Sequence, residues 1–168
     1  WVYLGIQKGQ VTQDGLTGLN NRRRLDQYMW ELDERSGERE TCCYLLMDVN
    51  KFKKVNDTYG HVTGDEVLRL VAEQLKRTFG NMQAFQARYG GDEFVVIVKG
   101  KTQDEMDVII HQTQENVNAI AWGADTPWQL SISIGCAMRG EQGKQKSHEL
   151  LALADERMYR QKKGIQDR

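Results

Sequence analysis

The fold of this chain is limited first of all by two glycines, Gly90 and Gly91, that lie between two apolar segments. Residues 83–89 precede the pair and residues 93–98 follow it, and both segments read as β-strands. Glycine tolerates the positive φ angles that tight hairpin turns need. The sequence therefore predicts a β-hairpin with Gly90 and Gly91 at its tip.

Other apolar patterns predict two more strands and four helices. Residues 42–49 form a short, nearly continuous apolar run, typical of a buried strand that ends at Asp48. Residues 130–136 alternate apolar with small polar side chains, as in a half-buried strand. Four segments repeat apolar side chains at helical spacing, which predicts amphipathic helices at about 20–35, 63–78, 106–120 and 147–163.

The order of these elements predicts how the chain folds. After the first helix it runs strand, helix, strand, strand, helix, strand, which is the ferredoxin-like split βαβ order. A right-handed crossover makes the first two strands parallel and lets the third pair between them. We therefore expect an α+β domain, with a ferredoxin-like or palm-like antiparallel-centred sheet and added N-terminal and C-terminal helices. In this topology Asp48 and the hairpin tip lie at the same edge of the sheet.

Length and charge fit one globular domain that does not bind nucleic acid. The chain has 168 residues, 39% of them hydrophobic, and no linker-like stretch divides it. Its formal net charge is -1, with basic and acidic side chains mixed along the sequence. It therefore lacks the broad positive field that attracts a nucleic-acid backbone. No apolar run approaches the roughly 20 residues of a membrane-spanning helix.

The cysteines indicate the redox compartment of the chain, and its first residues indicate a connection to a longer protein. Cys42, Cys43 and Cys136 lack the paired spacing of a zinc site or redox motif, so we expect small core residues in a reducing compartment. The chain does not begin with a methionine, which suggests a fragment. We expect residues 1–13 to be the end of an upstream connector or an artificial boundary. Residues 14–168 would be a cytoplasmic domain, with a sensory or membrane region upstream.

Three acidic side chains are predicted to meet at the shared sheet edge. Asp48 ends the first strand, and Asp92 and Glu93 directly follow the hairpin glycines. Carboxylate oxygens suit hard cations such as magnesium, which keep their other coordination positions for water and phosphate oxygens. The alternative, an ordinary hairpin with solvated acids at its tip, stays open on these residues alone.

Several segments resemble one known family. Residues 88–94, with the sequence Arg-Tyr-Gly-Gly-Asp-Glu-Phe, are similar to the signature of the GGDEF-type diguanylate cyclases. Residues 48–57 resemble the metal and guanine segment of that family. Similar segments at residues 14–23, 59–65 and 155–162 follow in the family's order and at its separations. The resemblance implies a diguanylate cyclase catalytic domain.

The resemblance implies an active site with two metal ions, either Mg²⁺ or Mn²⁺. The implied ligands are Asp48, the carbonyl of Val49, Asp92 and Glu93. Two such ions can polarise the α-phosphate of GTP and lower the pKa of an attacking hydroxyl. The implied catalytic residues are Asp92, Glu93 and Lys162.

The resemblance also implies how the triphosphate is bound. Backbone N–H groups of Phe52 and Lys53 would bind β- and γ-phosphate oxygens, with Lys162 as an additional point charge. The turn at Gly90 and Gly91, which has no side chains, would let the triphosphate approach the backbone. Taken alone, Lys162 is typical of a solvated helix end.

Asn56 and Asp65 are the implied guanine-binding residues. Guanine presents a ring N–H and an exocyclic amino group side by side to one carboxylate, whereas adenine would leave a desolvated acid without a partner. On their own, Asn56-Asp57 is more typical of a turn, and Asp65 of an acid favoured at a helix N-terminus. The implied substrate is therefore GTP.

The resemblance implies a reaction that needs two copies of the domain. In the family, each domain binds one GTP, and two domains face each other so that each 3′-hydroxyl attacks the other α-phosphate with loss of pyrophosphate. The implied function is condensation of two GTP into cyclic di-GMP by a homodimer. Two alternatives stay open: a catalytically inactive GTP-binding regulatory domain, and another nucleotidyl transfer such as adenylate cyclase chemistry.

Two departures of the sequence from the family bear on its activity. Many members carry an inhibitory Arg-x-x-Asp motif that binds product, and the corresponding residues here are Asn81 and Ala84. The loss of both charges predicts weak or absent feedback inhibition. Gln166 occupies the position of an arginine that helps Lys162 hold phosphate. We expect weaker affinity for GTP unless another basic residue near the end of the chain substitutes.

Overall fold

The computed structural model describes residues 11–35, 41–123, 128–140 and 145–166, with residues 165 and 166 described by backbone only. Within this part, the helices are α1 (Arg22–Arg35), α2 (Phe52–Tyr59), α3 (His61–Phe79), α4 (Gln103–Asn118) and α5 (Ser147–Gln166). The strands are β1 (Cys42–Val49), β2 (Ala84–Arg88), β3 (Glu93–Lys99) and β4 (Ile132–Met138). Residues 1–10 of the expected connector (residues 1–13) and the side chain of Gln166 lie outside the described residues.

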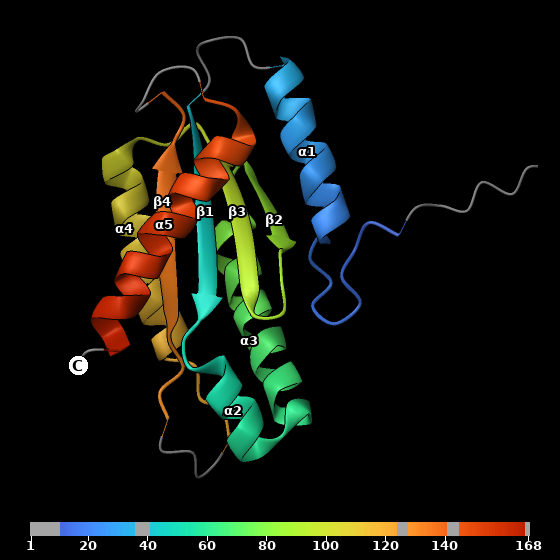
Figure 1. Ribbon diagram of the computed structural model, residues 1–168, viewed down its shortest axis with the longest axis vertical. Helices are drawn as coiled ribbons and strands as arrows, with labels where there is room; N and C mark the ends of the chain where they lie inside the picture. Colours follow the sequence, from blue (N-terminus) through green and yellow to red (C-terminus); the bar gives the residue numbers. More distant parts are fainter. Residues whose placement is uncertain (1–10, 36–40, 124–127, 141–144, 167–168) are drawn as a thin grey trace, which may run out of the picture.

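The strand order confirms the predicted topology. The sheet runs β2-β3-β1-β4, and each neighbouring pair is antiparallel. β3 therefore lies between β1 and β2, which run parallel to each other (Figure 1). The strand ends are shifted slightly, because β1 continues past Asp48 to Val49 and β4 covers Ile132–Met138 in place of residues 130–136. The fold is the expected α+β arrangement with additional helices at both ends of the chain.

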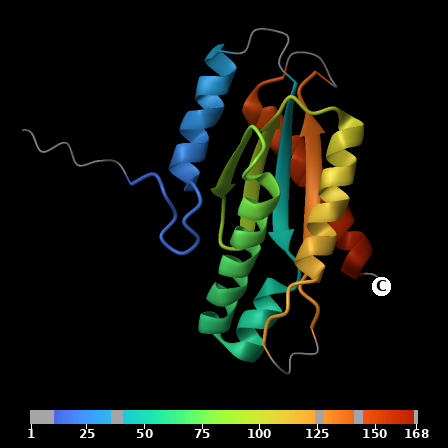
Figure 2. The same cartoon turned by 180° about the vertical axis from the view of Figure 1, so that it is seen from behind.

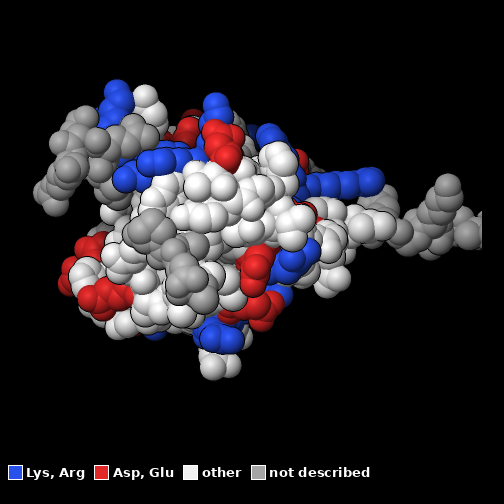
Figure 3. All heavy atoms as spheres, turned by 90° about the horizontal axis from the view of Figure 1, so that it is seen from below, with Lys and Arg blue, Asp and Glu red and all other residues white. Residues whose placement is uncertain are grey.

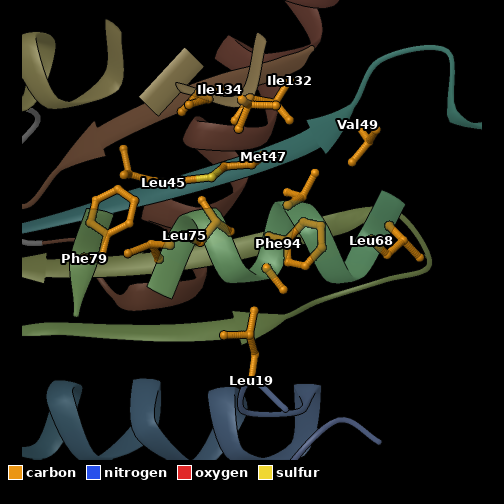
Figure 4. Close-up of a cluster of buried hydrophobic side chains, with 14 of the residues drawn as sticks. Leu19, Leu45, Met47, Val49, Leu68, Leu75, Phe79, Phe94, Ile132 and Ile134 are labelled. Atoms are coloured by element: carbon orange, nitrogen blue, oxygen red, sulfur yellow. The ribbon is translucent and has the colours of Figure 1, made fainter. Parts of the chain in front are cut away.

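Helices cover both faces of the sheet. α1 and α5 pack on one face, and α3 and α4 pack on the other, as Figures 1 and 2 show from opposite sides. In β1, Leu45 and Met47 join the core formed with α3 and α4 (Figure 4). Tyr44 and Leu46 join the core formed with α1 and α5. Because side chains alternate along a strand, Asp48 points to the same face as Leu46, toward α5.

The sequence patterns miss α2, and the turn favoured for Asn56-Asp57 on their own is wrong because both residues are helical. A helix of eight residues shows too few turns for a clear apolar period and is not stable in isolation. Gly60, with a φ of 86°, separates α2 from α3, which begins at His61 rather than at residue 63. Burial of Val55 in the core anchors the short helix.

A polar cluster fixes the start of α5. The carboxylate of Asp33, in α1, accepts a hydrogen bond from the backbone N–H of Ser147 at 3.0 Å. Arg139 donates to the same carboxylate at 3.0 Å and to the hydroxyl oxygen of Tyr44 at 2.9 Å. Burial raises the pKa of Tyr44 far above its usual value, so the phenol stays neutral. The cluster joins the first residue of α5 to α1 and β1.

α5 lies at close range against β4, an outer strand of the sheet. A Cβ on Gly135 of β4 would come within 1.8 Å of the carbonyl oxygen of Ala154 in α5. Nearer the end of the helix, the backbone N–H of Ile134 donates to Gln161 Oε1 at 2.6 Å. This bond satisfies a backbone group on the outer side of the strand. Together the two contacts fix how the end of α5 approaches the sheet.

Gly135→Ala is expected to destabilise the domain by about 3 kcal/mol. The new methyl group would meet backbone atoms of Ala154 and Met158, at 1.8 and 2.4 Å, and backbone atoms cannot rotate aside. Denaturation by urea measures the loss. Gly164→Ala is the control, because no atom lies within 4 Å of a Cβ there and alanine favours a helix. Equal losses in the two variants would contradict the packing argument.

The three cysteines are buried or half-buried, as predicted. Cys42 and Cys43 are buried in different cores, because adjacent strand residues point to opposite faces. Cys136, in β4, is half-buried, and its Sγ lies 3.0 Å from Sγ of Cys43. Their positions fit the interpretation as small core residues.

One end of the molecule shows the mixed charge of the sequence. Figure 3 views the end of the molecule where α2 lies, and basic and acidic side chains are interspersed there among other residues. In the described ranges, no helix combines the length and the apolar character needed to cross a membrane.

Candidate active site

The end of β1 and the tip of the β2–β3 hairpin meet, as predicted. Asp48 lies opposite Glu93 in the pairing of β1 with β3. One residue further, the backbone N–H of Val49 donates to the carbonyl oxygen of Asp92 at 3.1 Å. Acidic residues from two segments that are distant in sequence therefore lie side by side at the end of the sheet next to α2 (Figure 1).

Arg88 and Asp14 brace the glycine turn. Arg88 donates to the carbonyl oxygen of Gly91 through Nη2 at 2.7 Å and through Nε at 3.2 Å. Its Nη1 pairs with the carboxylate of Asp14 at 3.3 Å. Burial disfavours the charge on Asp14, but hydrogen bonds from Thr17 and the charge of Arg88 outweigh burial and lower the pKa of Asp14. Neither residue has a role predicted from the sequence, although both lie in segments that resemble the family.

The two hairpin glycines differ in the space that a side chain would find around them. A Cβ on Gly90 would lie 2.6 Å from Oε2 of Glu93, so the absence of a side chain there makes room for that carboxylate. The backbone N–H groups of Tyr89 and Gly90 donate to the Glu93 carbonyl oxygen at 2.8 and 3.3 Å, which closes the turn. At Gly91 no atom lies within 4 Å of the Cβ position. The space beside the turn is therefore open at Gly91.

The acidic residues shift one another's pKa. Burial raises the pKa of Asp48, which is 6% exposed, and the charges of Asp92 and Asp155 raise it further. A hydrogen bond from Lys162 opposes this shift. Burial also raises the pKa of Glu93, and the charges of Asp48 and Asp92 add to the effect. The charge of Asp155, from α5, thus acts on both Asp48 and Glu93, although in the sequence this residue is singled out only within a segment that resembles the family.

Lys162 reaches the cluster from the last turns of α5. Its Nζ lies 2.6 Å from Oδ1 of Asp48, and the two side chains are only 27% and 8% exposed. Because α5 continues to Gln166, Lys162 is not at the end of the helix. The interpretation of Lys162, taken alone, as a solvated helix end is therefore wrong.

The chemistry of the cluster fits a magnesium-type ion. Among the residues that the structure describes, no three His, Cys, Asp or Glu side chains are grouped to hold a metal ion. The side chains that converge are nevertheless oxygen donors, which Mg²⁺ and Mn²⁺ prefer. The raised pKa values of Asp48 and Glu93 indicate a site short of positive charge, which an added cation would supply. Asp48, Asp92, Glu93 and the carbonyl of Val49 stay the predicted ligands.

The start of α2 lies directly after β1 and suits a phosphate group. Lys51 adopts a φ of 56°, in the left-handed region that lysine seldom occupies, and its side chain does not cap the helix. The first N–H groups of a helix lack acceptors within the helix, which applies here to Phe52 and Lys53. These are the N–H groups that the resemblance assigns to the phosphates. At the other end of α2, Tyr59 packs edge-on against Trp122 at 5.7 Å.

Asn56 and Gly64 form a close contact between α2 and α3. A Cβ on Gly64 would lie 1.8 Å from Oδ1 of Asn56 and 3.3 Å from the ring of Phe52. This oxygen of Asn56 is buried and has no hydrogen-bond partner in the described part of the chain. A buried acceptor without a donor is costly, so a group that donates a hydrogen bond to it would be stabilising. Asp65, the next residue of α3, is exposed.

Comparisons with known proteins connect this geometry to one family. Residues 11–168 match the protein family described as "Diguanylate cyclase, GGDEF domain". The chain is 38% identical over 156 residues to the probable diguanylate cyclase DgcI of Escherichia coli, covering 90% of the chain and 31% of that protein. It is 32% identical over 160 residues to the probable diguanylate cyclase DgcC of Escherichia coli, covering 94% of the chain and 42% of that protein. The chain thus spans less than half the length of these relatives.

A solved structure gives the same result for the fold. The GGDEF domain of DgcB from Caulobacter crescentus, in complex with c-di-GMP, aligns with a TM-score of 0.81 at 30% sequence identity. The alignment covers 92% of this chain and 91% of that chain. Similarity therefore extends over almost the whole of both chains rather than over the signature alone.

Proposed function

The chain belongs to the GGDEF domain family of diguanylate cyclases, and from that premise we propose that it condenses two GTP molecules into cyclic di-GMP and pyrophosphate. The observation that carries the proposal is the convergence of Asp48, Asp92 and Glu93 with Lys162 beside the start of α2. This convergence would bring oxygen ligands for cations, a positive charge and N–H groups able to bind phosphate to one place.

The metal-binding groups would be the carboxylates of Asp48, Asp92 and Glu93 and the carbonyl of Val49. Two Mg²⁺ or Mn²⁺ ions, when bound, would polarise the α-phosphate and lower the pKa of the attacking 3′-hydroxyl. The carboxylates come from β1 and from the hairpin, which pair directly, so their spacing is set by the sheet. A rigid support of this kind favours positioning and charge stabilisation over covalent chemistry.

The substrate would be held at its two ends. The N–H groups of Phe52 and Lys53 would bind β- and γ-phosphate oxygens at the start of α2, and Lys162 would add a positive charge. At the other end, Asn56 and Asp65 would bind guanine. The buried, unpaired Oδ1 of Asn56 supports this assignment, because guanine has N–H groups that an acceptor in that position requires.

Completion of the ring would require two domains, because each site would hold a single GTP. We propose a homodimer in which each 3′-hydroxyl attacks the α-phosphate held by the opposite domain. Since the curated relatives are more than twice as long as the chain, we further propose that residues 14–168 are one cytoplasmic domain of a longer protein. Residues 1–13 would then connect it to an upstream sensory or membrane region.

Product formation tests the proposal. The purified domain, at high concentration to force pairing, is incubated with GTP and Mg²⁺, and the nucleotide product is identified by mass spectrometry. Cyclic di-GMP with release of pyrophosphate is expected from GTP but not from ATP. GTP binding without product would favour an inactive regulatory domain. A cyclic product from ATP would favour the adenylate cyclase alternative.

Feedback inhibition is expected to be weak or absent. Asn81 is exposed and Ala84 is half-buried at the start of β2, so neither offers a charge to the product at the place of the Arg-x-x-Asp motif. The double variant Asn81→Arg, Ala84→Asp should bind cyclic di-GMP at least about tenfold more tightly, because it regains charge-assisted hydrogen bonds. Calorimetric titration of both proteins measures the difference. Tight binding by the unaltered chain outside the active site would contradict the expectation.

A further inference from the structure

Lys162 lies on the carboxylate that a metal ion is proposed to bind. Its ammonium is 2.6 Å from Oδ1 of Asp48, and the Asp48 side chain is only 8% exposed. The turn of α5 that carries it is held in place, because Gln161 accepts a hydrogen bond from Ile134 of β4 at 2.6 Å. Gly135 allows the close approach of the helix to the strand. The ammonium is therefore presented to Asp48 by a supported segment rather than by a loose side chain.

We propose that Lys162 is the resting counter-ion of the metal site and that a divalent ion binds Asp48 by displacing it. The inference rests on the proposed function, which makes Asp48 a metal ligand. The contact itself agrees with it, because one oxygen of Asp48 is already bonded to the ammonium.

The displacement of Lys162 from Asp48 lowers the affinity of the domain for a metal ion. A buried carboxylate without a positive partner is unfavourable, and Lys162 provides that partner while no metal is bound. A divalent ion at Asp48 would lie within a few ångströms of the ammonium, and the two positive charges would repel each other. Lys162 therefore weakens metal binding to the domain that has no nucleotide.

GTP reverses this effect, because its triphosphate offers the displaced ammonium a new partner. Metal and nucleotide would then bind cooperatively, and each would strengthen binding of the other by the same factor. A lysine that only held phosphate would have no effect on metal binding in the absence of GTP. Removal of the Lys162 charge should therefore raise the affinity for metal without nucleotide if Lys162 is a counter-ion, and should leave that affinity unchanged if Lys162 only binds phosphate.

The test measures Mn²⁺ binding without nucleotide, by calorimetry at pH 8. Lys162→Gln is expected to bind Mn²⁺ at least about tenfold more tightly than the unaltered domain, because the competing charge is gone. Lys162→Arg keeps the charge and should retain the weak binding. Lys162→Met, which keeps the aliphatic stem, provides the same test should Lys162→Gln fail to fold, as judged by circular dichroism.

Lys163→Gln is the matched control. It removes one positive charge a single residue away, but Lys163 is exposed and its Nζ lies 4.7 Å from the centre of the Tyr159 ring rather than on an acid of the cluster. Its Mn²⁺ affinity should equal that of the unaltered domain. Equal strengthening in Lys162→Gln and Lys163→Gln would reduce the effect to net charge and overturn the proposal.

The outcomes distinguish this inference from the proposed function. Unchanged Mn²⁺ affinity in folded Lys162→Gln and Lys162→Met overturns the counter-ion role, whether or not the unaltered domain makes cyclic di-GMP. Stronger Mn²⁺ binding in both variants supports the role even if the unaltered domain forms no cyclic product from GTP, a result that would count against the proposed function alone.

Discussion

Asp92→Ala is expected to lower the rate of cyclic di-GMP formation by at least about a thousandfold, at saturating Mg²⁺ and GTP. Asp92 is proposed to bind metal together with Asp48 and Glu93, and its backbone carbonyl bonds to Val49 of β1. The substitution removes the carboxylate but leaves that backbone bond. The site would lose a negative charge and a metal ligand, but the backbone bond between the hairpin and β1 would remain.

The free energy of unfolding of Asp92→Ala distinguishes a catalytic defect from a folding defect. The charge of Asp92 raises the pKa of both Asp48 and Glu93, so the three acids repel one another. Asp92→Ala relieves that repulsion, and the free energy of unfolding should be unchanged or slightly higher. Asp26→Ala is the control, because Asp26 is exposed on α1 and is not among the charges that shift the pKa of Asp48 or Glu93. Near-normal turnover by Asp92→Ala would remove Asp92 from the proposed metal ligands.

The convergence of these acids could be predicted because it follows from topology. The right-handed crossover rule places β3 between β1 and β2, and the hairpin then returns to the end of β1. The pairing of Asp48 with Glu93 follows from the position of each residue at its strand end. No detail of side-chain packing is needed for this step.

The missed helix shows where sequence patterns fail. α2 has eight residues, and its formation depends on tertiary contacts, through burial of Val55 and the edge-on packing of Tyr59 against Trp122. Local preference alone favours a turn at Asn56-Asp57. The distant residue Trp122 belongs to the segment between α4 and β4, so its contact with α2 is not visible in the local sequence.

The contacts of α5 could not be predicted for a similar reason. Lys162 meets Asp48, and Gln161 meets the backbone of Ile134, only because Gly135 lets the helix lie close to β4. A single glycine in a strand pattern does not reveal which element will approach it. Resemblance to the family assigns Lys162 to phosphate, but it gives no partner for the ammonium in the absence of GTP.

Gly64→Ala is expected to lower kcat/KM for GTP by about a hundredfold, because a shift of about 1 Å at a substrate-binding group can cost that much. A Cβ at this position would lie 1.8 Å from Oδ1 of Asn56, well inside contact distance. Asn56 would have to swing away from the proposed guanine site, and Phe52, 3.3 Å from the same Cβ, would restrict where it goes. The unpaired oxygen would then leave the position from which it is proposed to accept a hydrogen bond from guanine.

The loss should fall on guanine recognition rather than on folding or metal binding. Discrimination between GTP and ATP should shrink in Gly64→Ala, measured as the ratio of the two binding constants, whereas Mn²⁺ affinity without nucleotide should be unchanged. Gly15→Ala is the matched control, because a Cβ at Gly15 has no atom within 4 Å. If Gly64→Ala kept full preference for GTP while Asn56 moved, as an NMR shift of its side-chain amide would report, Asn56 would not be the residue that reads the base.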